Sequence, residues 1–115
     1  MDSRQQQIET ATASPSDLLA RLPGPATSIW PDGQRFIEAI SHGSLVVELY
    51  APIGKDPQAA HDRDEVYFVI SGSGDFVAGE KRHAFSPGTA LFVAAGVAHR
   101  FENFSPDFAT WVVFY

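Results

Sequence analysis

From Trp30 onward the chain alternates short apolar segments with glycine and proline, and this spacing constrains the fold more than any other feature. The apolar segments are rich in Val, Ile, Phe and Tyr: RFIEAI, SLVVELYA, EVYFVI, DFVA, ALFVA, HRFENF and FATWVVFY. Short β-type segments with turn residues about every 8–12 positions are typical of a sandwich or barrel. Two connections, Ser41-His42-Gly43 and Ser71-Gly72-Ser73-Gly74, are expected to be tight hairpins. The pattern predicts an all-β fold.

The residues before Trp30 have a different character. Residues 1–15 are polar and carry few large apolar side chains, which predicts a flexible arm. Ser16 is expected to cap a short helix that presents three leucines on one side and ends at Pro23. A length of 115 residues suits one domain. We therefore expect an arm over 1–15 and a single barrel domain over 16–115.

Charge and composition exclude several classes of function. Asp and Glu number 14 against 8 Lys and Arg, whereas a nucleic-acid-binding protein needs a basic surface. The chain has no cysteine, which excludes disulfides, iron–sulfur clusters, thiolate nucleophiles and cysteine-based zinc sites. No apolar stretch is long enough to span a bilayer, and no secretory signal opens the chain. These observations predict a cytoplasmic protein with neither nucleic-acid nor membrane partners.

A histidine and a carboxylate stand close together at the start of the segment EVYFVI. In a straight strand the Cα atoms of His61 and Glu65 would lie about 13 Å apart. One metal ion needs them closer, because each ligand Cα lies roughly 6 Å from the metal. A turn over residues 62–64 would bring them together, with His61 ending one strand and Glu65 beginning the next. His99, at the start of HRFENF, could complete a three-ligand set.

Two stretches of the chain resemble the motifs of the cupin family. The first cupin motif places a His-x-His pair before a Glu and a later Gly, and it is matched here by His61, Glu65 and Gly72. The second motif is matched by Gly88, Gly96, His99 and Asn103. The resemblance implies a small single-domain cupin, which is a double-stranded β-helix or jelly-roll barrel, with a short N-terminal helix. Cupins of this size are often homodimers, and the resemblance implies the same here.

The sequence departs from the family pattern at two positions. Ala59 stands where the first histidine of the first motif is expected, and Ala94 stands in place of a proline in the second. The resemblance therefore implies three of the usual four protein ligands, namely His61, Glu65 and His99. Two imidazoles and one carboxylate with open positions suit Fe²⁺, and Mn²⁺, Ni²⁺ or Zn²⁺ as well.

The leading hypothesis is a divalent metal site that acts on a small organic molecule, with dioxygenase- or isomerase-like chemistry. A divalent ion on one carboxylate leaves a positive charge, which favours an anionic or chelating substrate. Tyr67 is a candidate pocket residue because it shares the strand face of Glu65, and Phe101 and Asn103 should likewise face inward with His99. The alternative is a non-enzymatic binding or sensing cupin whose degenerate pocket holds no metal. Whether the chain is an enzyme stays open.

Three further polar residues lie outside the proposed ligand set. His42 is expected in a turn, and His83, within the charged hairpin EKRH, is expected to face solvent. Gln58 is the nearest residue that could replace the missing ligand. It has the opposite parity to His61, so in an extended strand its side chain would point away from the site.

Overall fold

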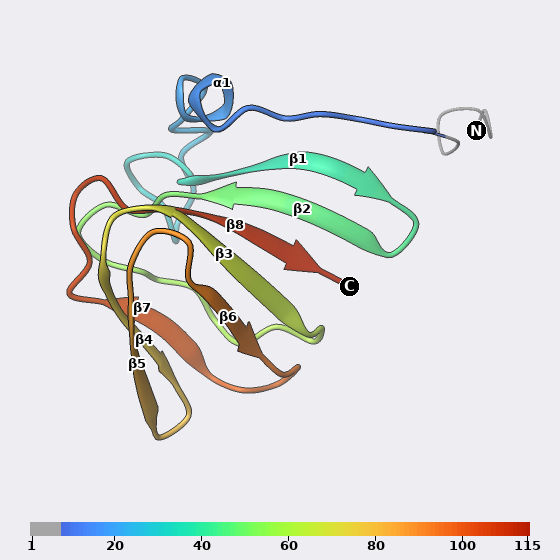
Figure 1. Cartoon of the computed structure of the whole chain (residues 1–115). Helices are drawn as coiled ribbons and strands as arrows, with labels where there is room; N and C mark the ends of the chain where they lie inside the picture. The colour runs from blue at the N-terminus through green and yellow to red at the C-terminus, as the bar shows by residue number, and fades with distance from the viewer. Residues whose placement is uncertain (1–7) are drawn as a thin grey trace.

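The computed structural model describes residues 8–115; the first seven residues of the predicted arm lie outside the described residues. Within this range a short helix precedes eight strands: α1 (Pro15–Leu19), β1 (Phe36–His42), β2 (Leu45–Tyr50), β3 (Glu65–Ser71), β4 (Gly74–Ala78), β5 (Lys81–Phe85), β6 (Ala90–Val93), β7 (His99–Glu102) and β8 (Ala109–Phe114). The strands form two antiparallel sheets, ordered β1-β2-β8-β3-β6 and β5-β4-β7 (Figure 1). The predicted all-β fold with a short N-terminal helix is confirmed.

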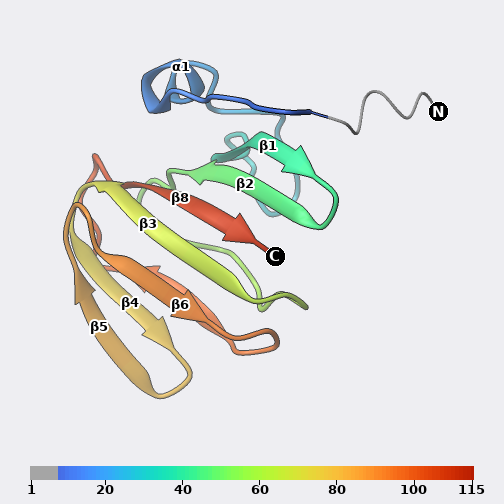
Figure 2. The same cartoon turned by 45° about the vertical axis from the view of Figure 1, so that its right-hand side comes forward.

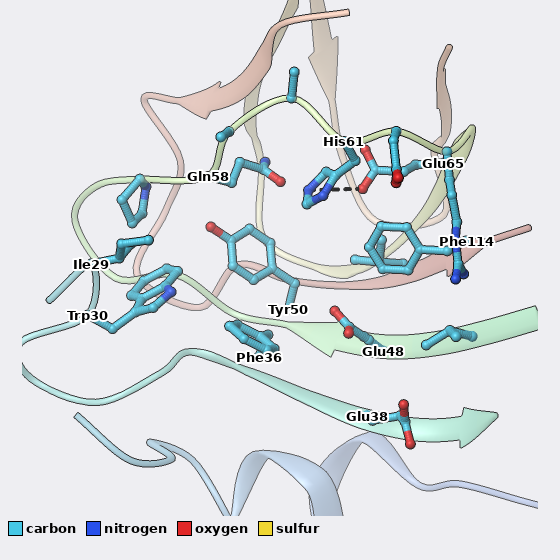
Figure 3. A pocket seen from close by; sticks show the side chains of 17 residues that line it. Ile29, Trp30, Phe36, Glu38, Glu48, Tyr50, Gln58, His61, Glu65 and Phe114 are labelled. Atoms are coloured by element: carbon cyan, nitrogen blue, oxygen red, sulfur yellow. Dashed lines mark ion pairs between the residues drawn. The ribbon is translucent and has the colours of Figure 1, made fainter. Parts of the chain in front are cut away.

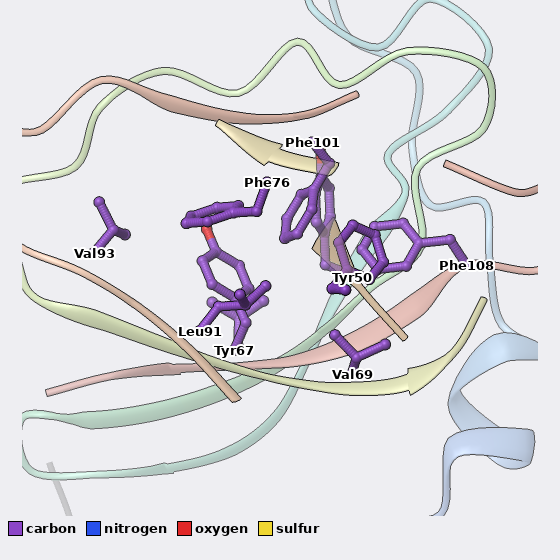
Figure 4. Packing of buried hydrophobic residues seen from close by; sticks show 10 residues of the cluster. Tyr50, Tyr67, Val69, Phe76, Leu91, Val93, Phe101 and Phe108 are labelled. Carbon is purple, nitrogen blue, oxygen red and sulfur yellow. The ribbon is translucent and has the colours of Figure 1, made fainter. Parts of the chain in front are cut away.

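The core lies between the two sheets. Alternate residues of β3 are buried, which places Glu65, Tyr67 and Val69 on the inner face, as the sequence predicted. Phe76 from β4 and Phe101 from β7 meet Tyr67 from the opposite sheet, with ring centroids 5.0–5.4 Å apart (Figure 4). Phe108 packs 4.7 Å from Phe101 and closes the end of this cluster. Interlocked aromatic rings therefore hold the two sheets together.

The β1–β2 hairpin extends the larger sheet away from the smaller one (Figures 1 and 2). Its two strands pair through a two-residue turn, Gly43-Ser44, which confirms the predicted hairpin but places Ser41 and His42 in β1 rather than in the loop. The irregular segment over residues 51–64 then leads from the end of β2 to the start of β3. This arrangement leaves one face of the hairpin open toward residues 51–64, and the cavity described below lies there.

The short helix covers part of the outer face of the larger sheet. Leu18 is buried against Leu49 and Ala109, from β2 and β8. The helix ends at Leu19, short of the expected Pro23, and it begins two residues earlier than expected, with Ser14 rather than Ser16 at the N-cap position. Pro15 explains the difference, because proline has no amide hydrogen to leave unpaired at the first helical position.

No helix among residues 8–115 is both long and apolar enough to cross a membrane.

The second predicted hairpin is wrong. Strands β3 and β4 follow one another in the chain but belong to different sheets, so the Ser71–Gly74 connection crosses from one sheet to the other. Gly72 has a positive φ of 81°, and a Cβ there would lie 2.5 Å from the Cα of Phe108. Glycine is required because two backbones approach closely at this crossover.

Strand β5 was not anticipated from its residues. Lys81, Arg82 and His83 are exposed, so the segment shows little of the apolar alternation that marks a strand. Phe85 is its one buried side chain, and pairing with β4 places the other residues in the smaller sheet.

Candidate metal centre

Three side chains from separate segments meet inside the barrel. His61 comes from the loop before β3, Glu65 begins β3 and His99 begins β7. One ligand atom of each lies within 4.8 Å of the others. The Nε2 atom of His61 lies 3.3 Å from Oε1 of Glu65, and Nε2 of His99 lies 2.9 Å from Oε2 of the same carboxylate. The structure thus brings together the three candidate ligands named from the sequence.

The segment that carries His61 and Glu65 is held by the turn that precedes His99. The amide of Gly96 donates to the carbonyl of His61 at 2.7 Å, and the amide of Ala95 donates to Oδ1 of Asp64 at 2.9 Å. Bends at residues 62 and 63 shorten the path from His61 to Glu65, as the reach of a single metal ion requires. The expectation that His61 ends a strand is wrong, because it lies within irregular residues 51–64. Backbone hydrogen bonds to the second motif fix its position instead.

The hydrogen-bonding environment of His99 leaves its Nε2 atom without a donor, so that a cation there would be favourable. Its Nδ1 lies 2.8 Å from the carbonyl oxygen of Val97, which can only accept, so Nδ1 carries the hydrogen. In the neutral ring Nε2 is then an acceptor that faces Oε2 of Glu65, another acceptor. Neither Nε2 of His99 nor Oε1 of Glu65 has a hydrogen-bond partner within the described residues, although both atoms are buried. Unpartnered buried acceptors are costly. A metal ion would satisfy both atoms, whereas a proton on Nε2 of His99 would pair that atom with Oε2 of Glu65 and leave Oε1 beside His61, whose Nε2 lies 3.3 Å away.

The neighbours of His99 also determine the pKa of its ring. Burial favours the neutral ring, but contact with Glu65, the hydrogen bond to Val97 and the charge of Asp56 outweigh it, so the pKa of His99 is raised. The folded protein therefore holds this proton more tightly than the unfolded chain does. In the metal-free protein, the stabilisation is present below the ordinary pKa of 6.5 and is lost as pH rises through the raised value.

We expect the free energy of unfolding of the metal-free protein to decrease over this pH window. Urea unfolding measured at a series of pH values tests this expectation. The variant His99→Ala serves as the control and should show a shallower dependence on pH over the same window. An equally steep dependence in that variant would assign the effect to another group.

A hydrogen-bond network behind the carboxylate links it to the loop over residues 51–64. Tyr67 is fully buried, and its hydroxyl lies 3.3 Å from both Oε2 of Glu65 and Oε1 of Gln58. The Nε2 of Gln58 donates to Asp56 at 2.6 Å, which turns Oε1 toward Tyr67. Burial, and next the charge of Glu65, raise the pKa of Tyr67, so its hydroxyl keeps its proton. Tyr67 can donate that proton to only one of the two acceptors at a time.

Asp56 anchors this network and was missed as a functional candidate. Its carboxylate accepts hydrogen bonds from the hydroxyl of Tyr50, from both the backbone and side-chain nitrogens of Gln58, and from the amide of Phe101 at 2.8 Å. The last of these ties the loop to β7, two residues beyond His99. Asp56 therefore positions Gln58 and the loop relative to the candidate ligands.

A cavity of about 640 Å³ opens beside the three candidate ligands (Figure 3). Small-molecule sites commonly have volumes of about 300–1,000 Å³. His61 and Glu65 line it, together with Gln58 and Ala59. Gln58 therefore faces the cavity, contrary to the parity argument, because residues 51–64 do not form the extended strand that argument assumed. Tyr67 lies behind Glu65, outside the residues that line this cavity, and its direct contact with a ligand stays a prediction.

Other cavity-lining residues lie in segments that the motif spacing did not connect to the site. Trp30 comes from the loop before β1, Glu38 from β1, and Glu48 and Tyr50 from β2. The available signal was a charged residue in the middle of an apolar strand, as in SLVVELY and FIEAI. A glutamate at such a position needs either solvent or a polar cavity.

The remaining sequence-based assignments have mixed outcomes. His83 is exposed on β5, as predicted, and His42 is the exposed last residue of β1, next to the turn. Phe101 faces inward, but the prediction for Asn103 is wrong because β7 ends at Glu102. Asn103 has a positive φ of 53° and its side-chain amide donates to Asp75 at 3.1 Å.

Comparison with known proteins matches residues 46–115 to the cupin domain. An uncharacterized protein of Streptomyces coelicolor is 36% identical over 81 residues, which cover 69% of this chain and 77% of that protein. The structure is similar to TT1209 from Thermus thermophilus, with a TM-score of 0.61 and 26% identity, over 73% of this chain and 84% of the other. The DMSP lyase DddQ of Ruegeria pomeroyi has the same fold, with a TM-score of 0.60 and 24% identity, over 69% of this chain and 45% of the lyase.

Proposed function

Because this chain belongs to the cupin family, we propose that it binds one divalent metal ion through His61, Glu65 and His99 and acts on a small organic molecule in the adjacent cavity. The observation that carries the proposal is a pair of buried atoms, Nε2 of His99 and Oε1 of Glu65, that form no hydrogen bond with any described residue, although Nε2 of His61 lies 3.3 Å from Oε1. Both belong to side chains that converge with His61 on one point. A metal ion there would satisfy both acceptors at once.

The donor set indicates what chemistry the site supports. Two imidazoles and one carboxylate suit Fe²⁺, Mn²⁺, Ni²⁺ or Zn²⁺, and such an ion supplies Lewis acidity or, as iron, the activation of O₂. The hydrogen bond from His99 to Val97 fixes the ring so that Nε2 points to the carboxylate. The hydroxyl of Tyr67 holds a proton beside Oε2 of Glu65 and helps to orient that side chain. A dioxygenase- or isomerase-like reaction is the chemistry we propose.

Metal analysis tests the proposal directly. We expect about one equivalent of divalent metal per chain after reconstitution, and His99→Ala should weaken binding by more than the 10–100-fold that loss of an outer-shell partner costs. The matched control is His83→Ala, which removes an exposed histidine on β5 and should leave metal binding unchanged. Equal binding by wild type and His99→Ala, measured by elemental analysis and competition titration, would contradict the proposed ligand set.

The second candidate function is a non-enzymatic cupin that binds or senses a small molecule without metal. It is favoured by the 2.9 Å contact between Glu65 and His99 together with the raised pKa of His99. A protonated His99 would neutralise the buried carboxylate in place of a metal. Purified protein that retains no metal after reconstitution, yet binds small molecules in the cavity, would support this alternative.

Two further parts of the proposal concern the state of the protein in the cell. The homodimer, which the cupin resemblance implies, and the cytoplasmic location, which the composition suggests, remain predictions. Sedimentation velocity tests the first and cell fractionation tests the second.

A further inference from the structure

We propose that the cavity beside the candidate metal centre contains a subsite for an organic ammonium group, formed by Glu38, Glu48 and an aromatic wall. The subsite exists in the chain whether or not a metal binds. Its assignment as part of a substrate site rests on the proposed function. The subsite would then specify the class of substrate, which is a small amine.

The acidic half of the subsite comes from two neighbouring strands. Glu38 on β1 lies directly opposite Glu48 on β2, and both line the cavity (Figure 3). Like charges directly opposite one another in a sheet are destabilising. Burial, and then the charges of Glu38 and Glu65, raise the pKa of Glu48. A cation bound between the glutamates would relieve this repulsion.

The aromatic half continues along the same two strands. The next cross-strand pair on this face is Phe36 with Tyr50, and Trp30 packs against both rings, 6.4 and 6.0 Å away. Trp30 is held by the loop before β1, where its amide donates to the hydroxyl of Thr27 and its carbonyl accepts from Gly33. The hydroxyl of Tyr50 is already bonded to Asp56, so its ring is oriented. Aromatic faces beside carboxylates attract organic cations through cation–π and charge interactions.

A buried carboxylate that lines the same cavity adds to its negative charge, at the end where the candidate metal ligands lie. Glu65 is only 1% exposed, lines the cavity and has an unpartnered Oε1. Four carboxylates and a single guanidinium line the cavity, so its lining stays net negative even with a divalent ion on the candidate ligands. The expectation of an anionic substrate counted Glu65 alone. The tertiary structure adds Glu38 and Glu48 to the same cavity, and the subsite that we propose there would favour a cation instead.

The geometry favours an organic cation over a second metal ion. Among residues 8–115, the one group of three His or carboxylate ligands within reach of a single ion is His61, Glu65 and His99. Glu38 and Glu48 have no third such ligand. An ammonium group needs fewer ligands than a metal ion, and its hydrocarbon portion would contact the aromatic wall.

Binding of n-butylammonium, compared with 1-butanol and butyrate, tests the subsite. The readout is the indole N–H signal of Trp30 in proton–nitrogen NMR, recorded on protein treated with EDTA and again with Zn²⁺ added. We expect n-butylammonium to bind at least about tenfold more tightly than either of the other two, in both states. Glu48→Gln should weaken ammonium binding by about tenfold, and Trp30→Leu, followed on neighbouring amide signals, by about threefold or more.

The matched control is Glu80→Gln, which removes an equal charge from an exposed turn and should leave ammonium binding unchanged. Glu48→Gln is expected to fold, because it removes repulsion and keeps the shape of the side chain. Butyrate or butanol binding as tightly as n-butylammonium, or Glu48→Gln binding it like wild type, would overturn the proposal. If the wild-type protein bound n-butylammonium but not Zn²⁺, the result would contradict the proposed function and would still support the ammonium subsite.

Discussion

Replacing Glu65 by glutamine is expected to weaken divalent metal binding by more than about 100-fold. Glutamine keeps the size of the side chain but removes the negative charge that both histidines face at 3.3 and 2.9 Å. The same change removes the contact and the charge that raise the pKa of His99, so this pKa should decrease. Competition titration with a chelating dye measures the metal affinity, and NMR titration of the His99 ring measures its pKa.

The two readouts distinguish a ligand from a purely structural residue. If Glu65 only supported the fold, Glu65→Gln would alter stability and leave the affinity of the folded protein for metal unchanged. Glu80→Gln provides the control for charge removal, since Glu80 is exposed in the turn after β4. A metal affinity equal to that of wild type would exclude Glu65 from the ligand set, whatever happened to the pKa of His99.

Truncating Phe101 to alanine is expected to lower the free energy of unfolding by about 3–5 kcal/mol. Phe101 is 2% exposed, and its ring lies 4.7–5.0 Å from those of Tyr67, Phe76 and Phe108. These rings come from both sheets and from the loop before β8, so a cavity at this point removes contacts between the sheets. Urea unfolding followed by circular dichroism measures the change.

The control for this truncation is Ile53→Ala, because Ile53 is 63% exposed. We expect a change within about 0.5 kcal/mol for that variant, as for most surface substitutions. A loss of less than about 1 kcal/mol for Phe101→Ala would show that the core rearranges to fill the space. In that event the aromatic cluster could not be the main link between the two sheets.

Much of the fold could be predicted from residue pattern alone. The segment EVYFVI forms β3 with the expected face inward, because alternation in a strand places every second residue on the same side. The segment KRHAF could not be recognised as β5, since most of its side chains are exposed and its place depends on pairing with β4. The glycines at the Gly72 crossover predict a hairpin, because glycine serves both tight turns and close backbone approaches, and the sequence does not distinguish the two.

The candidate ligands were also accessible to sequence reasoning, but their surroundings were not. Spacing and residue type were enough to select His61, Glu65 and His99, which the structure brings within 4.8 Å. Gln58 and Asp56 depend on the path of an irregular loop, which no periodicity describes. The loop is set by hydrogen bonds to residues far away in the chain, such as that between Asp56 and the amide of Phe101.

The alternation of apolar segments with glycine and proline determined the all-β class, and two motifs determined which histidines and carboxylate could share a metal. Both are local properties, since strand periodicity and motif spacing act over a few residues. Only the tertiary structure decided the charge and shape of the cavity. Glu38 and Glu48 lie opposite each other and line the same cavity as the candidate ligands His61 and Glu65, because β1 pairs with β2 in one particular register and residues 51–64 lie over that face.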